Sequence, residues 1–208
     1  MKQKLHLDTW VRKEHFHLFK QFDEPFYGVT VRIDCTKAYL FAKEKEASFF
    51  LYTMHRALAA ANALEPFKLR IEDDEVYIYD QIDAGSTIGR SNGTFGFGYI
   101  PYASQFDQFI ITANKEVESV QNSNDLIRSK VNNIIRFSSL PWIDFTSISH
   151  ASTFGSQNSC PRISFGKMTQ QDGKRSMPVS IHVHHALIDG LHVGQYIDLF
   201  QELMDSVV

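Results

Sequence analysis

Hydrophobic and polar residues alternate along some stretches of this chain and recur at helical spacing along others. Tyr27–Asp34 alternates apolar with polar positions, which predicts a half-buried strand, and residues 68–80 predict two strands around an acidic turn. The clearest predicted helix covers residues 47–63. Its apolar face carries Phe50, Met54, Ala57, Leu58 and Ala61.

The rest of the chain continues this mixture. Further helices are predicted from Asp8 or Thr9 through Phe19, over residues 104–120, and at the C-terminus with Val193, Tyr196, Ile197, Phe200 and Leu203 inward. The remaining strands are predicted at residues 134–138, 162–168 and 179–185, with a turn at 170–174. Interleaved strands and helices without a linker predict one domain over residues 1–208, of class α/β, with a mixed β-sheet flanked by helices.

Composition excludes several classes of protein. A formal net charge of -3 leaves no basic footprint for nucleic acid. The two cysteines, Cys35 and Cys160, form no disulfide framework and lack metal-ligand spacing, which favours a reducing compartment. No apolar run approaches the ~18 residues of a membrane span, and no leader is evident at the N-terminus. These observations predict a soluble, cytoplasmic protein.

Aromatic residues are frequent, with 17 Phe in 208 residues, which predicts an aromatic core or an aromatic-lined pocket. The stretch G-T-F-G-F-G-Y-I-P-Y, residues 93–102, alternates glycines with aromatic residues. Such alternation is typical of a strand that approaches another backbone closely or faces a ligand. Phe95, in this stretch, is therefore a candidate substrate contact.

Four of the nine histidines lie between His182 and His192, in H-V-H-H-A-L-I-D-G-L-H. The side-chain period of two in the predicted strand places one row on one face: Val179, Ile181, Val183 and His185. His182 and His184 fall on the other, more polar face. An imidazole that ends an apolar row is partly desolvated, which lowers its pKa and favours the neutral form that acts as a base.

Two other interpretations of the histidine cluster remain open on the residues alone. His182 and His184 could chelate a metal on one strand face. A zinc site needs three or four ligands, however, and no cysteine or paired carboxylate lies nearby in sequence, so no metal is predicted. In a purely structural interpretation, the histidines are partly exposed and Asp189 caps the following helix.

Five ordered segments of the chain resemble one family. H-H-A-L-I-D-G, beginning at His184, resembles the H-H-x-x-x-D-G signature of the coenzyme A-dependent acyltransferases. D-T-W-V-R-K-E-H-F (8–16), P-Y-A-S-Q-F-D-Q-F (101–109) and S-S-L-P-W-I-D-F (138–145) resemble segments of the chloramphenicol acetyltransferases. The segment 179–193 and the Q-E-L that follows it (201–203) are similar to the same family.

The resemblance implies a trimeric acetyltransferase fold with active sites at subunit interfaces. It implies transfer of an acetyl group from acetyl-CoA to a hydroxyl of a small acceptor, in one ternary complex without an acyl-enzyme. The acceptor is expected to be chloramphenicol or a more polar or anionic hydroxylated compound. The competing hypothesis is a catalytically silent binding protein of the same fold, which would show no acceptor-dependent release of CoA.

The resemblance also assigns roles to residues of the catalytic centre. His185, the second histidine of the pair, is expected to be the general base. Ser138 is expected to donate to the oxyanion of the tetrahedral intermediate, and Ser164 to hold a water molecule at the transition state. Asp189 is expected to form an ion pair with Arg12 that braces the turn presenting His185, and it could cap a helix at the same time.

The acceptor pocket departs from the family pattern. The expected pocket positions are Phe19, Pro25, Tyr27, Phe95, Arg136, His150 and Arg162. Arg136, His150 and Arg162 replace neutral residues, which favours a polar, anionic acceptor because buried guanidinium groups need anionic partners. The alternative is that the arginines pair with a local carboxylate such as Asp144. Met168 stands where an aromatic residue often packs near CoA in the family.

Overall fold

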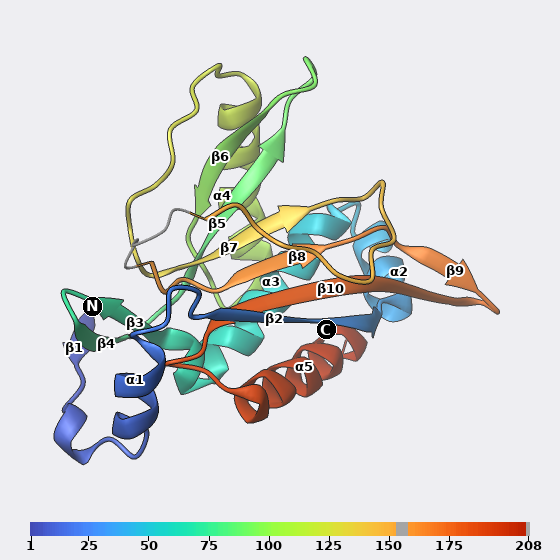
Figure 1. Cartoon of the computed structure of the whole chain (residues 1–208). Helices are drawn as coiled ribbons and strands as arrows, with labels where there is room; N and C mark the ends of the chain where they lie inside the picture. The colour runs from blue at the N-terminus through green and yellow to red at the C-terminus, as the bar shows by residue number, and fades with distance from the viewer. Residues whose placement is uncertain (153–157, 207–208) are drawn as a thin grey trace.

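The computed structural model describes residues 1–152 and 158–206. Its largest feature is a seven-stranded sheet in the order β2-β10-β8-β7-β5-β6, with β9 paired to β10 (Figure 1). The strands are β2 (Phe26–Asp34), β5 (Asp83–Gly89), β6 (Phe95–Ile100), β7 (Ile134–Ser139), β8 (Arg162–Phe165), β9 (Thr169–Gln171) and β10 (Lys174–His184). β7 runs parallel to β5 and β8, and the other pairs are antiparallel, so the predicted mixed sheet is confirmed.

A second, three-stranded sheet has the order β1-β4-β3. Its strands are β1 (Lys2–Lys4), β3 (Leu69–Glu72) and β4 (Glu75–Tyr79). Asp73 and Asp74 both adopt a positive φ between β3 and β4, the left-handed conformation that a two-residue hairpin turn requires. The acidic hairpin predicted over residues 68–80 is confirmed.

Helices cover one face of the large sheet. α2 (Thr36–Glu44), α3 (Phe49–Ala63) and α5 (Gly190–Asp205) pack together beneath it, while α4 (Phe106–Gln121) lies beside β5 and β6, which project from the remainder (Figure 1). Ser48 caps α3 by accepting from the Leu51 N–H. The shorter helices are α1 (Lys13–Phe19) and two 3-10 turns, η1 (Leu7–Thr9) and η2 (Glu65–Lys68).

Several element boundaries differ from the sequence predictions. The first helix begins at Lys13 instead of Asp8 or Thr9, because residues 7–9 form a separate 3-10 turn and Trp10 is extended. α2 and β5 were not predicted, since neither has a clear period. β8 ends at Phe165, three residues early, because the Gly166 and Lys167 N–H groups turn to the carbonyls of Pro178 and Ile143.

The last long strand follows the predicted alternation. Val179, Ile181 and Val183 are at most 1% exposed and belong to the core beneath the sheet. Ser180, His182 and His184 lie on the opposite face, but Ser180 and His184 are buried as well. The side predicted to be more polar is therefore largely covered, and its polar groups need partners or ligands.

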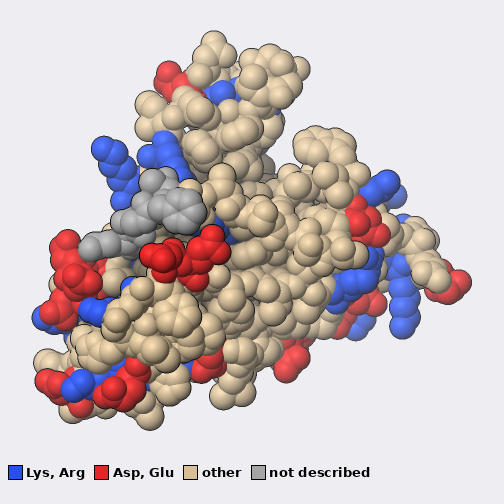
Figure 2. Space-filling view, viewed as in Figure 1, with Lys and Arg blue, Asp and Glu red and all other residues tan. Residues whose placement is uncertain are grey.

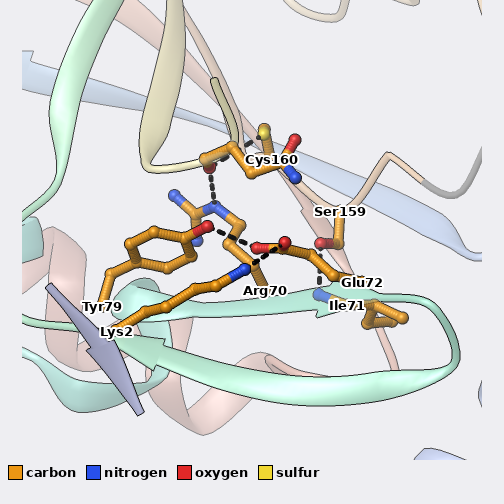
Figure 3. A network of polar contacts seen from close by, with 8 residues as sticks. Lys2, Arg70, Ile71, Glu72, Tyr79, Ser159 and Cys160 are labelled. Atoms are coloured by element: carbon orange, nitrogen blue, oxygen red, sulfur yellow. Dashed lines mark hydrogen bonds and ion pairs between the residues drawn. The ribbon is translucent and has the colours of Figure 1, made fainter. Parts of the chain in front are cut away.

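Arg70 of β3 ties the small sheet to the strands of the large one (Figure 3). Its guanidinium is fully buried and donates to the carbonyls of Phe67, Leu69, Asn132 and Ile134 at 2.6–2.9 Å. The Cys160 thiol donates to the same Asn132 carbonyl. These bonds fix the start of β7 and the approach to β8, which carry the predicted pocket residues.

Candidate active site

His185 is the first residue after β10, and its position is fixed on several sides. Its backbone N–H donates to the Pro25 carbonyl at 2.8 Å. Its ring stacks on Phe19, with centroids 3.8 Å apart and planes 6° apart, and lies 4.6 Å from the Tyr27 ring. We call His185, Phe19, Pro25 and Tyr27 the His185 corner. The structure thus brings these four predicted site residues together.

Arg12 and Asp189 form the predicted ion pair beneath this corner. The Arg12 Nη1 donates to the Asp189 carboxylate, and its Nη2 donates to the His185 carbonyl at 3.4 Å. Although burial opposes the shift, the Arg12 bond and charge lower the pKa of Asp189. The brace therefore reaches the backbone of His185 directly.

Asp189 also caps α5, as the sequence allowed. Its carboxylate accepts from the His192 N–H at 3.5 Å, while the His192 Nδ1 accepts from the Asp189 N–H at 3.2 Å. This reciprocal pair is a capping box in which histidine takes the place of the usual glutamate. His192 thus has a structural role, and the structure shows both contacts predicted for Asp189, the ion pair with Arg12 and the helix cap.

A second group of predicted residues lines a cavity of about 280 Å³ on the polar face of the sheet. We call it the β7–β8 pocket. Among its lining residues are Phe95, Arg128, Arg136, Ser138, His150 and Arg162. Five of these six were predicted site residues. Arg128 was missed because it lies in the irregular segment before β7, where no periodicity or motif marks it.

Strand register explains why these residues meet. Arg136 of β7 pairs with Arg162 of β8, which pairs with His182 of β10. Directly paired residues point to the same face, so the three form one row across the sheet. The row ends at Gly28, where an added Cβ would lie 2.3 Å from the His182 Nε2. Glycine is needed there because the imidazole lies on the backbone.

The adjacent row on the same face carries hydroxyl groups. Ser138 pairs with Ser164, which pairs with Ser180. The Ser180 Oγ is 3.2 Å from the His182 Nδ1, but the fully buried Ser164 Oγ has no hydrogen-bond partner among the described residues. A buried hydroxyl without a partner costs about 1–3 kcal/mol. A water molecule or ligand at Ser164 would remove that cost.

The arginines of the pocket do not pair with Asp144, so the alternative stated above is wrong. The Asp144 carboxylate accepts from Arg32 at 2.8 Å instead. Within residues 1–152 and 158–206, no carboxylate lies within ion-pair distance of Arg136 or Arg162. Burial lowers the pKa of both guanidinium groups, and the neighbouring arginines lower it further.

The His185 corner and the β7–β8 pocket are separate among the residues that the structure describes. His185, Phe19, Pro25 and Tyr27 are absent from the described lining of the β7–β8 pocket. The link between them is indirect: Arg162 lies over the Phe26 ring at 4.8 Å, and that ring meets His184 edge-on. The β7–β8 pocket of one chain, as far as its lining is described, thus holds four of the seven predicted acceptor positions: Phe95, Arg136, His150 and Arg162.

A further cavity, of about 350 Å³, begins where the β7–β8 pocket ends along β7. Ser138 lines the first cavity and its neighbour Ser139 lines the second, together with Phe50, Lys167 and Met168. Figure 2 shows Lys and Arg side chains beside the base of the projecting β5, β6 and α4. The end of β7 therefore lies between the two cavities, with Ser138 lining one and Ser139 lining the other.

In the described part of the chain, no group of three or more His, Cys, Asp and Glu side chains is placed to hold a metal ion. No helix in that part is long and apolar enough to cross a membrane. Among the clustered histidines, burial lowers the pKa of His184 to about 4, and its Nδ1 accepts from the Ala186 N–H.

Known proteins resemble this chain in sequence. A chloramphenicol acetyltransferase of Bacillus pumilus is 29% identical over 201 residues, which cover 95% of this chain and 91% of that protein. Chloramphenicol acetyltransferase 3 of Escherichia coli is 28% identical, covering 98% of this chain and 97% of its own.

Solved structures agree with the sequence comparison. One chloramphenicol acetyltransferase superposes with a TM-score of 0.92 at 31% identity, covering 98% of this chain and all of that one. The truncated catalytic core of a 2-oxoacid dehydrogenase complex from Thermoplasma acidophilum, at 14% identity and a TM-score of 0.67, shares the fold. The chloramphenicol acetyltransferase family model matches residues 2–201. This chain belongs to the chloramphenicol acetyltransferase family.

Proposed function

We propose that this chain transfers an acetyl group from acetyl-CoA to a hydroxyl of a small acceptor, as an enzyme of one domain. The observation that carries the proposal is the fixed imidazole of His185, held by Phe19 and by the Arg12–Asp189 brace. A silent binding protein would not require a histidine at the end of a strand to be held from both its ring and its backbone.

In this mechanism, His185 takes the proton from the acceptor hydroxyl as the hydroxyl oxygen attacks the thioester carbonyl. The thioester carbon becomes tetrahedral, and its oxygen gains negative charge. Ser138 donates a hydrogen bond to that oxyanion, while Ser164, its register partner, holds a water molecule nearby. Collapse of the intermediate releases CoA as its thiol, which receives the proton from His185.

The active site would form between two copies of the chain in a trimer. The separation of the His185 corner from the β7–β8 pocket supports this arrangement. The His185 corner of one subunit would close the β7–β8 pocket of the next, so base and oxyanion donor would come from different copies. A monomer would leave the two halves apart and would be inactive.

Acetyl-CoA would occupy the second cavity, on the other side of Ser139. Its wall offers the apolar contacts of Phe50 and Met168 for the pantetheine arm, and Lys167 offers a charge for phosphate. The acetyl group would then enter beside Ser138 from the side opposite the acceptor. The free, buried Cys35 and Cys160 support the expected reducing, cytoplasmic setting.

The decisive test is CoA release measured with a thiol reagent, across hydroxylated acceptors that include chloramphenicol. We expect His185→Ala to lower kcat by about 10²–10⁴-fold, the usual contribution of a general base. His15→Ala, at an exposed position, is the matched control and should retain wild-type kcat. Sedimentation should give a trimer for all three proteins.

Two results would contradict the proposal. Release of CoA that depends on acceptor but is unaffected by His185→Ala would exclude His185 as the base. No release with any acceptor, from a protein that still binds acetyl-CoA, would favour the silent binding protein.

A further inference from the structure

Three arginines reach the β7–β8 pocket from different segments: Arg136 from β7, Arg162 from β8 and Arg128 from the stretch before β7. Arg136 and Arg162 are register partners and point to the same face. Like charges held side by side in a half-buried place repel one another. An anion bound between them would offset this repulsion.

The described residues around the arginines do not supply that charge. The Arg162 Nη1 donates to the Ser152 hydroxyl at 3.0 Å, and its guanidinium rests on Phe26, both neutral partners. The Arg136 Nε is buried without a hydrogen-bond partner among residues 1–152 and 158–206. A guanidinium in this condition is suited to bind a carboxylate or phosphate oxygen.

The neighbouring imidazoles add hydrogen-bond capacity rather than charge. Burial, then His182 and Arg162, lower the pKa of His150 to about 4, so this ring is neutral at physiological pH. Its Nε2 is buried and has no partner in the part of the chain that the structure describes. The pocket therefore presents fixed positive charge and an unused imidazole nitrogen to whatever enters it.

The position of this charge relative to Ser138 limits the ligand. Arg136 lies two residues before Ser138 on the same face of β7, which separates the two backbone positions by roughly 7 Å. A cavity of about 280 Å³ lies at the small end of ligand pockets. Phe95 and Phe97 form its aromatic wall. A short molecule with an oxyanion at one end and a hydroxyl at the other fits these dimensions.

We propose that the natural acceptor is a small hydroxylated compound with a carboxylate or phosphate group, which Arg136 and Arg162 bind while its hydroxyl is presented beside Ser138. Arg128, at the exposed mouth, draws the anion in. This inference rests on the proposed acetyltransferase function and deepens it by naming the class of acceptor. The arginines bind and orient the acceptor, and they take no part in proton transfer.

Three acceptors of similar shape but different charged groups test which group the pocket binds. 4-(Hydroxymethyl)benzoate carries a carboxylate, 4-(hydroxymethyl)phenylphosphonate carries a phosphate-like dianion, and 4-(hydroxymethyl)benzamide is neutral. We expect both anions to have a KM lower than the amide by about 10–100-fold, as for hydrogen bonds to charged groups. The anion with the lower KM shows whether the natural acceptor carries a carboxylate or a phosphate group.

Variants test whether Arg136 and Arg162 cause the preference for anionic acceptors. Arg136→Met and Arg162→Met should each raise the KM for the preferred anion by about 10–100-fold and change its ratio to the amide by a similar factor. Arg175→Met is the matched control, because Arg175 belongs to the same sheet but lies over Tyr39, outside the pocket. It removes the same formal charge and should leave the ratio unchanged.

Binding to His185→Ala, measured by calorimetry, separates this inference from the proposed function. Tight binding of the anions but not of the amide, without turnover in the wild type, would support anion binding by the arginines and contradict the acetyltransferase function. Turnover of chloramphenicol and the amide as efficient as that of the anions would overturn the inference alone. The inference would also be overturned if Arg136→Met raised only the KM for acetyl-CoA, because the arginines would then bind CoA. It would likewise be overturned if Arg136→Met changed only the oligomeric state, because the arginines would then form a subunit contact.

Discussion

Arg70 is fully buried and Arg136 is half-buried, and the surroundings of their guanidinium groups differ. Arg70 donates to four backbone carbonyls, one of which belongs to Ile134, two residues before Arg136. Arg136 has a buried Nε without a described partner and a second arginine as its register neighbour. One guanidinium is satisfied by the fold, and the other is not.

The difference distinguishes a structural arginine from a binding arginine. A buried guanidinium that already uses its donors on the backbone cannot release them to a ligand without breaking the fold. A guanidinium with unused donors beside a cavity lowers the stability of the folded chain, because its donors are desolvated without partners. A ligand that accepts hydrogen bonds from these donors removes that cost, which strengthens its binding. Arg70 therefore holds the strands in place, and these strands position Arg136 and Arg162 for binding.

The largest expected effect is on the structural side of this comparison. Arg70→Met would leave several buried carbonyls without donors, and we expect the free energy of unfolding to fall by about 3–5 kcal/mol. Urea unfolding followed by circular dichroism, at one fixed protein concentration, measures the change. A loss below about 1 kcal/mol would mean that water replaces the guanidinium and that Arg70 is not a structural anchor.

The sequence correctly predicted helices and strands that have a strong hydrophobic period, and it predicted site residues that lie inside a motif. The alternation in β10 and the helical spacing of α3 and α5 reflect burial of one face, which the residue types record directly. Asp189 and Arg12, 177 residues apart, could be paired only through the resemblance to a family, and the structure shows the pair. Roles that depend on a motif were therefore recoverable.

The burial of Arg70 and the place of Arg128 in the pocket could not be predicted from the sequence. Nothing in K-L-R-I-E indicates that this arginine is fully buried, because it alternates with Leu69 and Ile71 as an exposed residue would. Arg128 reaches the pocket from a segment without regular structure. Both depend on long-range strand order, which the local pattern does not encode. The separation of Phe19 and Tyr27 from Arg136 likewise arises from topology.

On the binding side, the expected effect on stability is smaller and can have the opposite sign. Arg136→Met removes a half-buried charge that lacks a described partner, so we expect the free energy of unfolding to change by no more than about 1 kcal/mol, or to rise. The same urea unfolding applies. A loss as large as that of Arg70→Met would show that Arg136 has structural partners and would remove the contrast between the two arginines.

Among the substitutions, the smallest expected effect is a change in how stability depends on pH. The pKa of His150 and of His184 is about 4 in the folded chain, against an ordinary value near 6.5. Well above pH 6.5 both rings are neutral in the folded and in the unfolded chain. As the pH falls from 6.5 towards 4, the unfolded chain binds protons that the folded chain does not, so the free energy of unfolding falls.

Arg162→Met separates the two histidines, because burial lowers the pKa of both but Arg162 acts only on His150. Removing this charge raises the pKa of His150, so the variant should lose less stability than the wild type between about pH 7 and about pH 5. Arg175→Met should follow the wild type. Equal slopes in all three proteins would show that the charge of Arg162 is already screened from His150. The pocket would then behave like the solvated surface, and the need for a bound anion would weaken accordingly.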